Sequence, residues 1–383
     1  MDILKNITEK LEGQITEAGF EGANIVLYTK NEKFFRESEG KIKEIVNEIK
    51  KRIELRADKE LLLDSEKTEK EVRQIVPEEA EITNIIFDNH RSILIIEAKK
   101  PGMVIGKQGS TLEEIKKKTL WTPQVQRAAA IKSQIVENIR EVLYANNNYR
   151  RRFLNSIGKK IYTDWNPEKK DEWVRVTFLG AARQVGRSCF LLQTPNSNIL
   201  LDCGVDVSSQ GEEKFPQFNI PEFNISELDA VIISHAHIDH SGLVPYLYKM
   251  GYKGPVYMTA PTRDVSSLLA LDFIGVAYKQ AEKPLFSSQD IKEMVKHSIC
   301  LNYHEVTDVT PDIRVTFYNA GHVLGSAMVH INIGNGSHNL LYTGDYKFSR
   351  TRLLEPAASN FPRLESVITE STYGAKEDVL PPR

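Results

Sequence analysis

The chain has 383 residues with a formal net charge of −2, and 41% of its residues are hydrophobic. This length predicts two to three domains, with ample chain for a buried core in the largest. Its three scattered cysteines exclude a disulfide framework, its start lacks the apolar segment of a signal peptide, and no run reaches the roughly 18 apolar residues of a membrane span, so we expect a soluble, cytoplasmic protein.

Residues 1–69 are expected to form a first small α/β module. Residues 24–28 are strand-like, and apolar residues then recur at helical spacing, at Ile42, Ile45, Val46, Ile49 and Ile53. The Lys- and Glu-rich segment 58–70 is expected to connect this module to the next one.

Residues 70–145 are expected to form a second module. Two strand-like runs, 82–87 and 92–98, flank a turn at 88–90. A G-x-x-G sequence follows, made of Gly106, Lys107, Gln108 and Gly109. The helix after it is predicted to begin with a capping box, because Ser110 is followed three residues later by Glu113.

A G-x-x-G loop at the start of a helix can bring backbone amides against a nucleic-acid phosphate, and Lys107 adds a positive charge. The second module therefore resembles a KH domain, which implies that residues 106–109 clamp about four nucleotides of RNA. The alternative is an ordinary tight turn before a helix. The first module has a compatible order of elements but only Gly40 near the corresponding point, so we interpret it as a degenerate KH partner that packs and does not clamp RNA.

A basic connector is expected at residues 146–172. It holds Arg150, Arg151 and Arg152 between two aromatic residues, a combination that suits pairing with a nucleic-acid backbone and stacking on bases. Residues 99–160 contain 14 Lys and Arg against 4 Asp and Glu, which indicates a polyanionic partner. The alternative is that a helix continues through the arginines and presents them on a plain solvated face.

Residues 173–383 alternate between strand-like and helical segments. Strands are predicted at 174–179, 189–193, 198–202, 313–318, 327–333 and 339–342, with a hairpin turn at 334–336. Helices are predicted at 243–250, 263–278 and 289–298. Strands that pair into sheets covered by helices give an α/β domain.

Metal-ligand residues follow the apolar, strand-like run 231–233. The sequence His235-Ala236-His237-Ile238-Asp239-His240 places three imidazoles and a carboxylate on the loop at the end of that strand. Imidazole nitrogens and carboxylate oxygens are the ligands that suit catalytic zinc. His322 and Asp345 stand downstream and Asp202 upstream.

The order of these motifs resembles that of the metallo-β-lactamase superfamily, which implies an αβ/βα sandwich. The resemblance implies that His235, His237 and His322 bind one Zn²⁺, that Asp239 and His240 bind a second, and that Asp345 bridges the two. Such a pair of zinc ions activates water and stabilises both the attacking and the leaving oxygen of a phosphodiester. Asp202 suits an outer role, accepting the second N–H of a ligand histidine. The alternative for Asp202 is a turn before Gly204.

The segment Val367-Ile368-Thr369-Glu370-Ser371-Thr372-Tyr373-Gly374 resembles the acidic motif that opens the nucleic-acid-specific part of the β-CASP branch. Together with the KH-like modules, the chain resembles the archaeal cleavage-and-polyadenylation-specificity-factor ribonucleases. This implies a partial metallo-β-lactamase domain at 173–383, with Asp239 and Glu370 as catalytic residues. It also implies single-stranded RNA cleavage, endonucleolytic and in some members 5′ to 3′ exonucleolytic, in 3′-end processing or transcription termination. RNA is the expected partner, with the processing machinery and a second copy of the chain as further candidates.

The resemblance departs at one point. In that family two further histidine motifs follow the acidic motif, whereas the remaining histidines here all precede Glu370. We therefore expect a fragment or a reduced variant that is inactive or slow alone and whose second zinc site lacks a ligand. Two other functions remain open, a non-catalytic RNA-binding subunit and a small-molecule hydrolase of the same fold.

Overall fold

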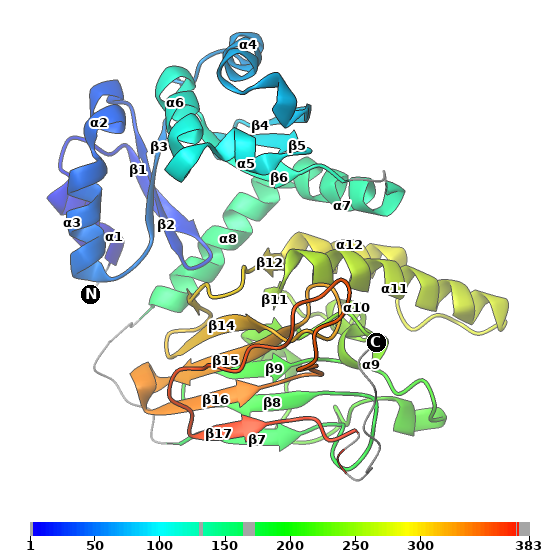
Figure 1. The fold of residues 1–383 in the computed structure, drawn as a ribbon. Helices are drawn as coiled ribbons and strands as arrows, with labels where there is room; N and C mark the ends of the chain where they lie inside the picture. Colours follow the sequence, from blue (N-terminus) through cyan, green and yellow to red (C-terminus); the bar gives the residue numbers. More distant parts are fainter. Residues whose placement is uncertain (1–2, 130–132, 164–172, 373, 375–383) are drawn as a thin grey trace. The chain divides into compact units, whose positions relative to one another are not determined.

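The computed structural model describes residues 3–129, 133–163, 173–372 and 374 (Figure 1). The chain divides into two compact units, Met1–Lys159 and Lys160–Arg383. Within the described residues, none of the helices combines the length and the apolar character that crossing a membrane requires.

The first unit begins with a module that has the element order αββααβ. Its elements are α1 (Ile3–Lys10), β1 (Glu17–Glu21), β2 (Asn24–Thr29), α2 (Glu32–Glu37), α3 (Glu39–Ile49) and β3 (Ile53–Ala57). The sheet order is β1-β2-β3, antiparallel and then parallel. Lys50 takes a left-handed conformation that ends α3, so Ile53, expected in the helix, instead opens β3.

The second module repeats this order and sheet topology. Its elements are α4 (Ser65–Ile75), the short η1 (Glu78–Ala80), β4 (Ile82–Asp88), β5 (Ile93–Ala98), α5 (Pro101–Ile105), η2 (Lys107–Gly109), α6 (Ser110–Thr119) and β6 (Thr122–Arg127). The strands lie in the order β4-β5-β6, again antiparallel and then parallel. Helix α4 begins inside the segment that we expected to be a connector, and its buried Val72 packs in the core of this module.

Two helices follow, α7 (Gln134–Ala145) and α8 (Asn147–Tyr162). The three consecutive arginines are helical, as in the alternative, but they lie on α8, which is separate from α7, and only Arg152 of the three is exposed. The Arg151 guanidinium lies 2.7 Å from the Glu17 carboxylate and over the ring of Tyr28, so this side chain packs on the first module. Part of the connector expected at 146–172 lies outside the described residues.

A buried ion cluster joins the two modules of the first unit. The Glu21 carboxylate accepts hydrogen bonds from Arg56 Nη1 at 2.6 Å and from Arg91 Nε at 2.7 Å, and Arg56 Nη1 also donates to the backbone carbonyl of Arg91 at 3.2 Å. Burial would raise the pKa of Glu21, but the two guanidinium groups outweigh burial and hold this pKa well below its usual value. Glu21 and Arg56 come from the first module and Arg91 from the second, so one carboxylate holds the modules together.

The second unit is built on two sheets. The first sheet contains β7 (Arg175–Phe178), β8 (Phe190–Gln193), β9 (Asn198–Leu201), β10 (Ala230–Ile232), β11 (Val256–Met258) and β12 (Ser298–Cys300), in the order β12-β11-β10-β9-β8-β7. The second contains β13 (Thr307–Asp308), β14 (Ile313–Asn319), β15 (Ala327–Ile333), β16 (His338–Tyr342) and β17 (Ser366–Ile368), in chain order. The helical segments are η3 (Gly211–Lys214), η4 (Ile225–Glu227), α9 (Ile238–Ser241), α10 (Val244–Lys249), α11 (Ala260–Lys279), α12 (Ser288–His297) and η5 (Gly334–Gly336).

The two sheets pack face to face. Alternate residues of each strand point to opposite sides of its sheet, so each strand contributes to two different cores. Ile199 and Leu201 of β9 lie in a core shared with Phe317 of the second sheet. Leu200, between them, faces the opposite core, into which α10 contributes Leu247. Helices α10, α11 and α12 cover this outer face of the first sheet (Figure 1). The outer face of the second sheet packs against segment 346–364. The predicted α/β sandwich is confirmed.

Candidate metal centre

The predicted metal-ligand residues follow strand ends at one edge of the two sheets. The loop after β10 carries His235 and His237, while Asp239 and His240, which we expected on the same loop, lie on the short helix α9 that follows it. His322 follows β14 and Asp345 follows β16. Strands β9 and β10 are parallel, and β14 and β16 both run antiparallel to β15, so the carboxyl ends of each pair meet at one edge.

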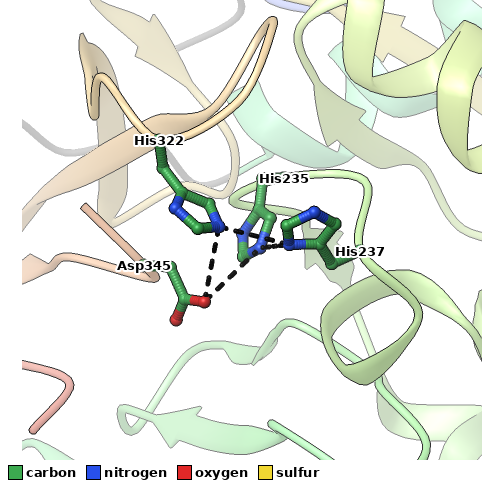
Figure 2. Close-up of side chains that lie close together, drawn as sticks. All are labelled: His235, His237, His322 and Asp345. Atoms are coloured by element: carbon green, nitrogen blue, oxygen red, sulfur yellow. Dashed lines mark hydrogen bonds and ion pairs between the residues drawn. The ribbon is translucent and has the colours of Figure 1, made fainter. Parts of the chain in front are cut away.

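Three imidazoles and one carboxylate converge on a common point (Figure 2). His237 Nδ1 lies 3.1 Å from His235 Nε2 and 3.2 Å from His322 Nε2. Asp345 Oδ2 lies 3.6 Å from His322 Nε2 and 3.9 Å from His235 Nε2. Tetrahedral zinc with bonds of about 2.0 to 2.1 Å needs ligand atoms about 3.3 Å apart. The spacing and donor types therefore fit a metal ion held by these four side chains.

The second carboxylate oxygen of Asp345 faces a neighbouring pair of residues. Asp345 Oδ1 lies 3.3 Å from His240 Nε2, which in turn lies 3.7 Å from Asp239 Oδ2. Asp345 thus presents one oxygen to the three-histidine group and the other to Asp239 and His240. This arrangement is suited to a carboxylate that bridges two cations.

Asp202 is fully buried and contacts the centre through His240. Its carboxylate accepts hydrogen bonds from the Ser234 backbone N–H and hydroxyl, both at 2.7 Å, from His240 Nδ1 at 2.7 Å and from the Tyr342 hydroxyl at 2.5 Å. Since His240 Nδ1–H donates to Asp202, Nε2 is the nitrogen of His240 that is directed toward a metal ion. The Ser234 hydroxyl lies 3.0 Å from His235 Nδ1. Since this hydroxyl donates its hydrogen to Asp202, it accepts from His235 Nδ1–H, which leaves the lone pair of His235 on Nε2. Asp202 therefore orients two imidazoles.

Burial and neighbouring charge set the protonation of these histidines. Burial lowers the pKa of His235 well below 6.5, and the adjacent imidazoles lower it further, so His235 stays neutral. Burial would also lower the pKa of His240, but hydrogen bonds with Asp202 and Asp345 outweigh burial and raise this pKa to about 10. The pKa of Asp345 is lowered, because the contacts with His240 and the other imidazoles outweigh its burial. A metal ion at His240 must displace a proton.

A cleft of about 440 Å³ opens beside Asp239, His240 and Asp345. Glu370, which follows β17, lines the same cleft, and its carboxylate accepts a hydrogen bond from the Thr372 backbone N–H at 3.3 Å. The structure thus brings Glu370 to the cleft that Asp239, His240 and Asp345 line. Tyr373, the seventh residue of the acidic motif, lies outside the described residues.

The predicted RNA-binding loop, 106–109, lies between α5 and α6 in the first unit. A Cβ on Gly106 would lie 2.2 Å from the Thr111 hydroxyl, which is too close, and both Gly106 and Gly109 have positive φ. Lys107 and Gln108 are exposed. The predicted capping box is wrong, because the left-handed Gly109 is the N-cap of α6 and no side chain caps this helix. Helix α6 therefore begins at a backbone turn and has no side-chain cap.

Sequence reasoning missed two residues of the centre. Ser234 immediately precedes His235. A hydroxyl residue next to a predicted metal ligand is the feature of the sequence that could have identified Ser234. Tyr342 ends β16 in an apolar run, and no local pattern separates it from a core tyrosine.

Three family models match the chain: a metallo-beta-lactamase superfamily domain at residues 191–372, the KH domain of transcription termination factor FttA at residues 1–62, and a KH domain at residues 67–120. These matches confirm that both N-terminal modules are KH domains and that the sandwich has the metallo-β-lactamase fold. That the first module packs without clamping RNA stays a prediction.

Relatives match along the whole chain. Transcription termination factor FttA is 50% identical to it in Methanothermobacter thermautotrophicus, 47% in Methanocaldococcus jannaschii and 40% in a Lokiarchaeum species. Each alignment covers 100% of this chain, which spans 59% to 61% of the length of these relatives.

Proposed function

Because this chain is a metallo-β-lactamase-superfamily protein with N-terminal KH domains, homologous along its length to the archaeal transcription termination factors FttA, we propose that it acts in transcription termination or RNA 3′-end processing as a zinc-dependent ribonuclease. The metallo-β-lactamase fold supports a metal-dependent hydrolase. The observation that carries the finer proposal is a His and Asp group, spaced for metal binding beside an open cleft, in a chain that also has a KH-type G-x-x-G loop.

We assign a metal-binding role to each of the six ligand-type residues of the centre. His235, His237 and His322 hold the first zinc ion, Asp239 and His240 the second, and Asp345 lies between the two. When bound, the ions would lower the pKa of water and stabilise negative charge on the phosphodiester. Zinc suits this mixed set of imidazole and carboxylate donors. Since Asp239 and His240 offer fewer ligands than the three-histidine group, the second ion is the weaker one.

The remaining groups orient the reactants. Asp239 has a carboxylate that is only partly buried at the edge of the cleft, so it can also hold the attacking water. Glu370 lines the cleft and can accept a hydrogen bond from that water. Asp202 keeps His240 and, through Ser234, His235 in the tautomers that direct Nε2 toward the metal. The proposed substrate is single-stranded RNA, which the protein cuts endonucleolytically; 5′ to 3′ exonuclease activity is a second proposed mode of cleavage.

The ribonuclease proposal is tested by cleavage of one end-labelled RNA by the native protein that carries these residues. We expect cleavage with Zn²⁺, none with EDTA, and a loss of at least a thousandfold in Asp239→Ala, because this variant lacks both a metal ligand and the group that orients water. Asp272→Ala, which removes an exposed carboxylate on α11, is the matched control and should cleave normally. RNA binding without metal-dependent cleavage would instead leave a non-catalytic RNA-binding subunit.

The G-x-x-G loop gives a separate prediction for RNA binding. Replacing Lys107 and Gln108 together by aspartate places two carboxylates against the expected phosphates, so the affinity for single-stranded RNA should fall by about tenfold or more. Fluorescence anisotropy at fixed salt measures this affinity. The double replacement of Arg73 and Gln74 by aspartate on α4 makes the same charge change at exposed positions and is the control. Equal affinities for the two variants would show that this loop does not contact RNA.

A further inference from the structure

The loop between β7 and β8, residues 180–188, has a strained backbone at the rim of the cleft. Ala181 and Arg183 have φ of 61° and Arg187 has φ of 41°, a region that residues with a Cβ rarely adopt. The loop is held at its end, where the Ser188 backbone N–H donates to the Asp239 carbonyl at 2.8 Å. Strain of this kind persists where the surrounding structure enforces it, most often at functional sites.

The strained backbone presents Arg183 to the cleft. This side chain is exposed, lines the cleft and makes no hydrogen bond or ion pair within the part of the chain that the structure describes. Among the described residues it is also the only Lys or Arg lining the cleft, whose acidic residues are Asp239, Asp345 and Glu370. An exposed guanidinium without a hydrogen-bond partner is suited to binding an external anion such as a phosphate.

An exposed aromatic ring lines the same cleft. Phe178 ends β7 and is 51% exposed. Its ring meets that of Phe190 edge to face, with centroids 5.2 Å apart and an interplanar angle of 89°. Phe190 is buried and packs in turn against Tyr342, which donates to Asp202. Packing against Phe190 therefore holds the Phe178 ring in place, while about half of the side chain remains accessible to a ligand.

We propose that Phe178 and Arg183 form a nucleotide subsite beside the metal centre. The Phe178 ring stacks on a base, and the Arg183 guanidinium pairs with the phosphodiester of the same strand. A flat base and an anionic phosphate are the two groups that this pair of side chains can recognise together, and every base offers a face for stacking. The subsite rests on the proposed ribonuclease function and assigns the residues that hold its single-stranded RNA at the reacting phosphate.

Cleavage kinetics of the native protein test the arginine. Arg183→Ala should raise KM by about tenfold or more, because it loses a charge-assisted hydrogen bond to phosphate, and should change kcat less. Arg183→Lys should recover part of the loss. The control is Arg175→Ala, since Arg175 is an exposed arginine on β7 that hydrogen-bonds Gln193 and does not line the cleft. Cleavage with an unchanged KM in Arg183→Ala would overturn the subsite and leave the ribonuclease proposal standing.

Photocrosslinking tests the subsite independently of cleavage. A tetraribonucleotide containing 5-iodouridine, irradiated with the native protein in EDTA, should crosslink to Phe178, as located by mass spectrometry. The yield should fall at least fivefold in Phe178→Leu and in Arg183→Ala. It should be unchanged in Tyr278→Leu, which removes an exposed ring of α11 outside the cleft. Crosslinks confined to residues 1–159, or equal yields from all variants with unchanged melting temperatures, would overturn the subsite even in a protein that does not cleave RNA.

Discussion

Replacing His235 by alanine is expected to remove the tightly bound metal ion. His235 is completely buried, its pKa is lowered so that it is neutral, and its Nε2 faces both His237 and Asp345. Loss of an outer hydrogen-bond partner of a ligand costs about 10- to 100-fold in metal affinity, and loss of the ligand itself should cost more. Zinc titration by calorimetry and elemental analysis of the purified protein measure this effect.

The control for this variant is His90→Ala, which removes an exposed histidine in the first unit. It should bind as much zinc as the unaltered protein. Tight, stoichiometric zinc retained by His235→Ala, or no zinc in the unaltered and unchelated protein, would contradict the proposed ligand set.

Replacing Asp202 by alanine should impair both metal binding and stability. Four donor groups converge on this buried carboxylate, and its loss leaves them without their acceptor. The free energy of unfolding should fall by about 3 to 5 kcal/mol. For a unit of this size the melting temperature should fall by about 10 °C. Because His240 and His235 lose their orientation, metal affinity should fall by about 10- to 100-fold.

Asp202→Asn separates the two effects. The amide keeps the volume of the carboxylate but brings N–H groups toward donors, so stability should recover in part while metal affinity stays low. Calorimetric unfolding and zinc titration report the two quantities. Asp229→Ala removes a carboxylate that accepts from the Asn198 backbone N–H at 2.9 Å and should leave zinc affinity unchanged. An Asp202→Ala variant that binds zinc normally would show that Asp202 does not orient the ligands.

The residues around the metal centre were predictable because they follow strand ends in a fixed order along the chain. His235, His237 and His240 lie within six residues, and a strand of three apolar residues precedes them. The convergence of four donors on Asp202 was not predictable in the same way. Ser234 reaches Asp202 only once β9 and β10 pair in the first sheet, and Tyr342 only once the second sheet packs on the first. Such contacts leave no periodic trace in the sequence.

Secondary structure was predicted best where the apolar pattern was long. Strand β15 was predicted with its observed bounds, and β5 and β14 within one residue at one end. Among the missed strands, β11, β12 and β17 have three residues each, too few to show alternation. Strands β1, β3 and β6 were missed as well, although they have five or six residues. Helix α4 was missed because its sequence is dominated by Lys and Glu and buries only Thr68 and Val72. Whether such short or polar segments form a strand or a helix depends more on contacts with neighbouring strands and modules than on the local sequence pattern.

The ion cluster around Glu21 affects how deletion experiments on the first unit should be interpreted. Residues 1–62 supply the carboxylate that neutralises Arg91 of the second module. Removing them would take away the nearer carboxylate partner of that guanidinium, which is one-fifth exposed in the intact chain, and leave it, among the described residues, only Asp88 at 3.8 Å. Weaker RNA binding after such a truncation would then reflect a perturbed neighbour. A point substitution in the loop of each module is therefore the cleaner way to map which of them touches the nucleic acid.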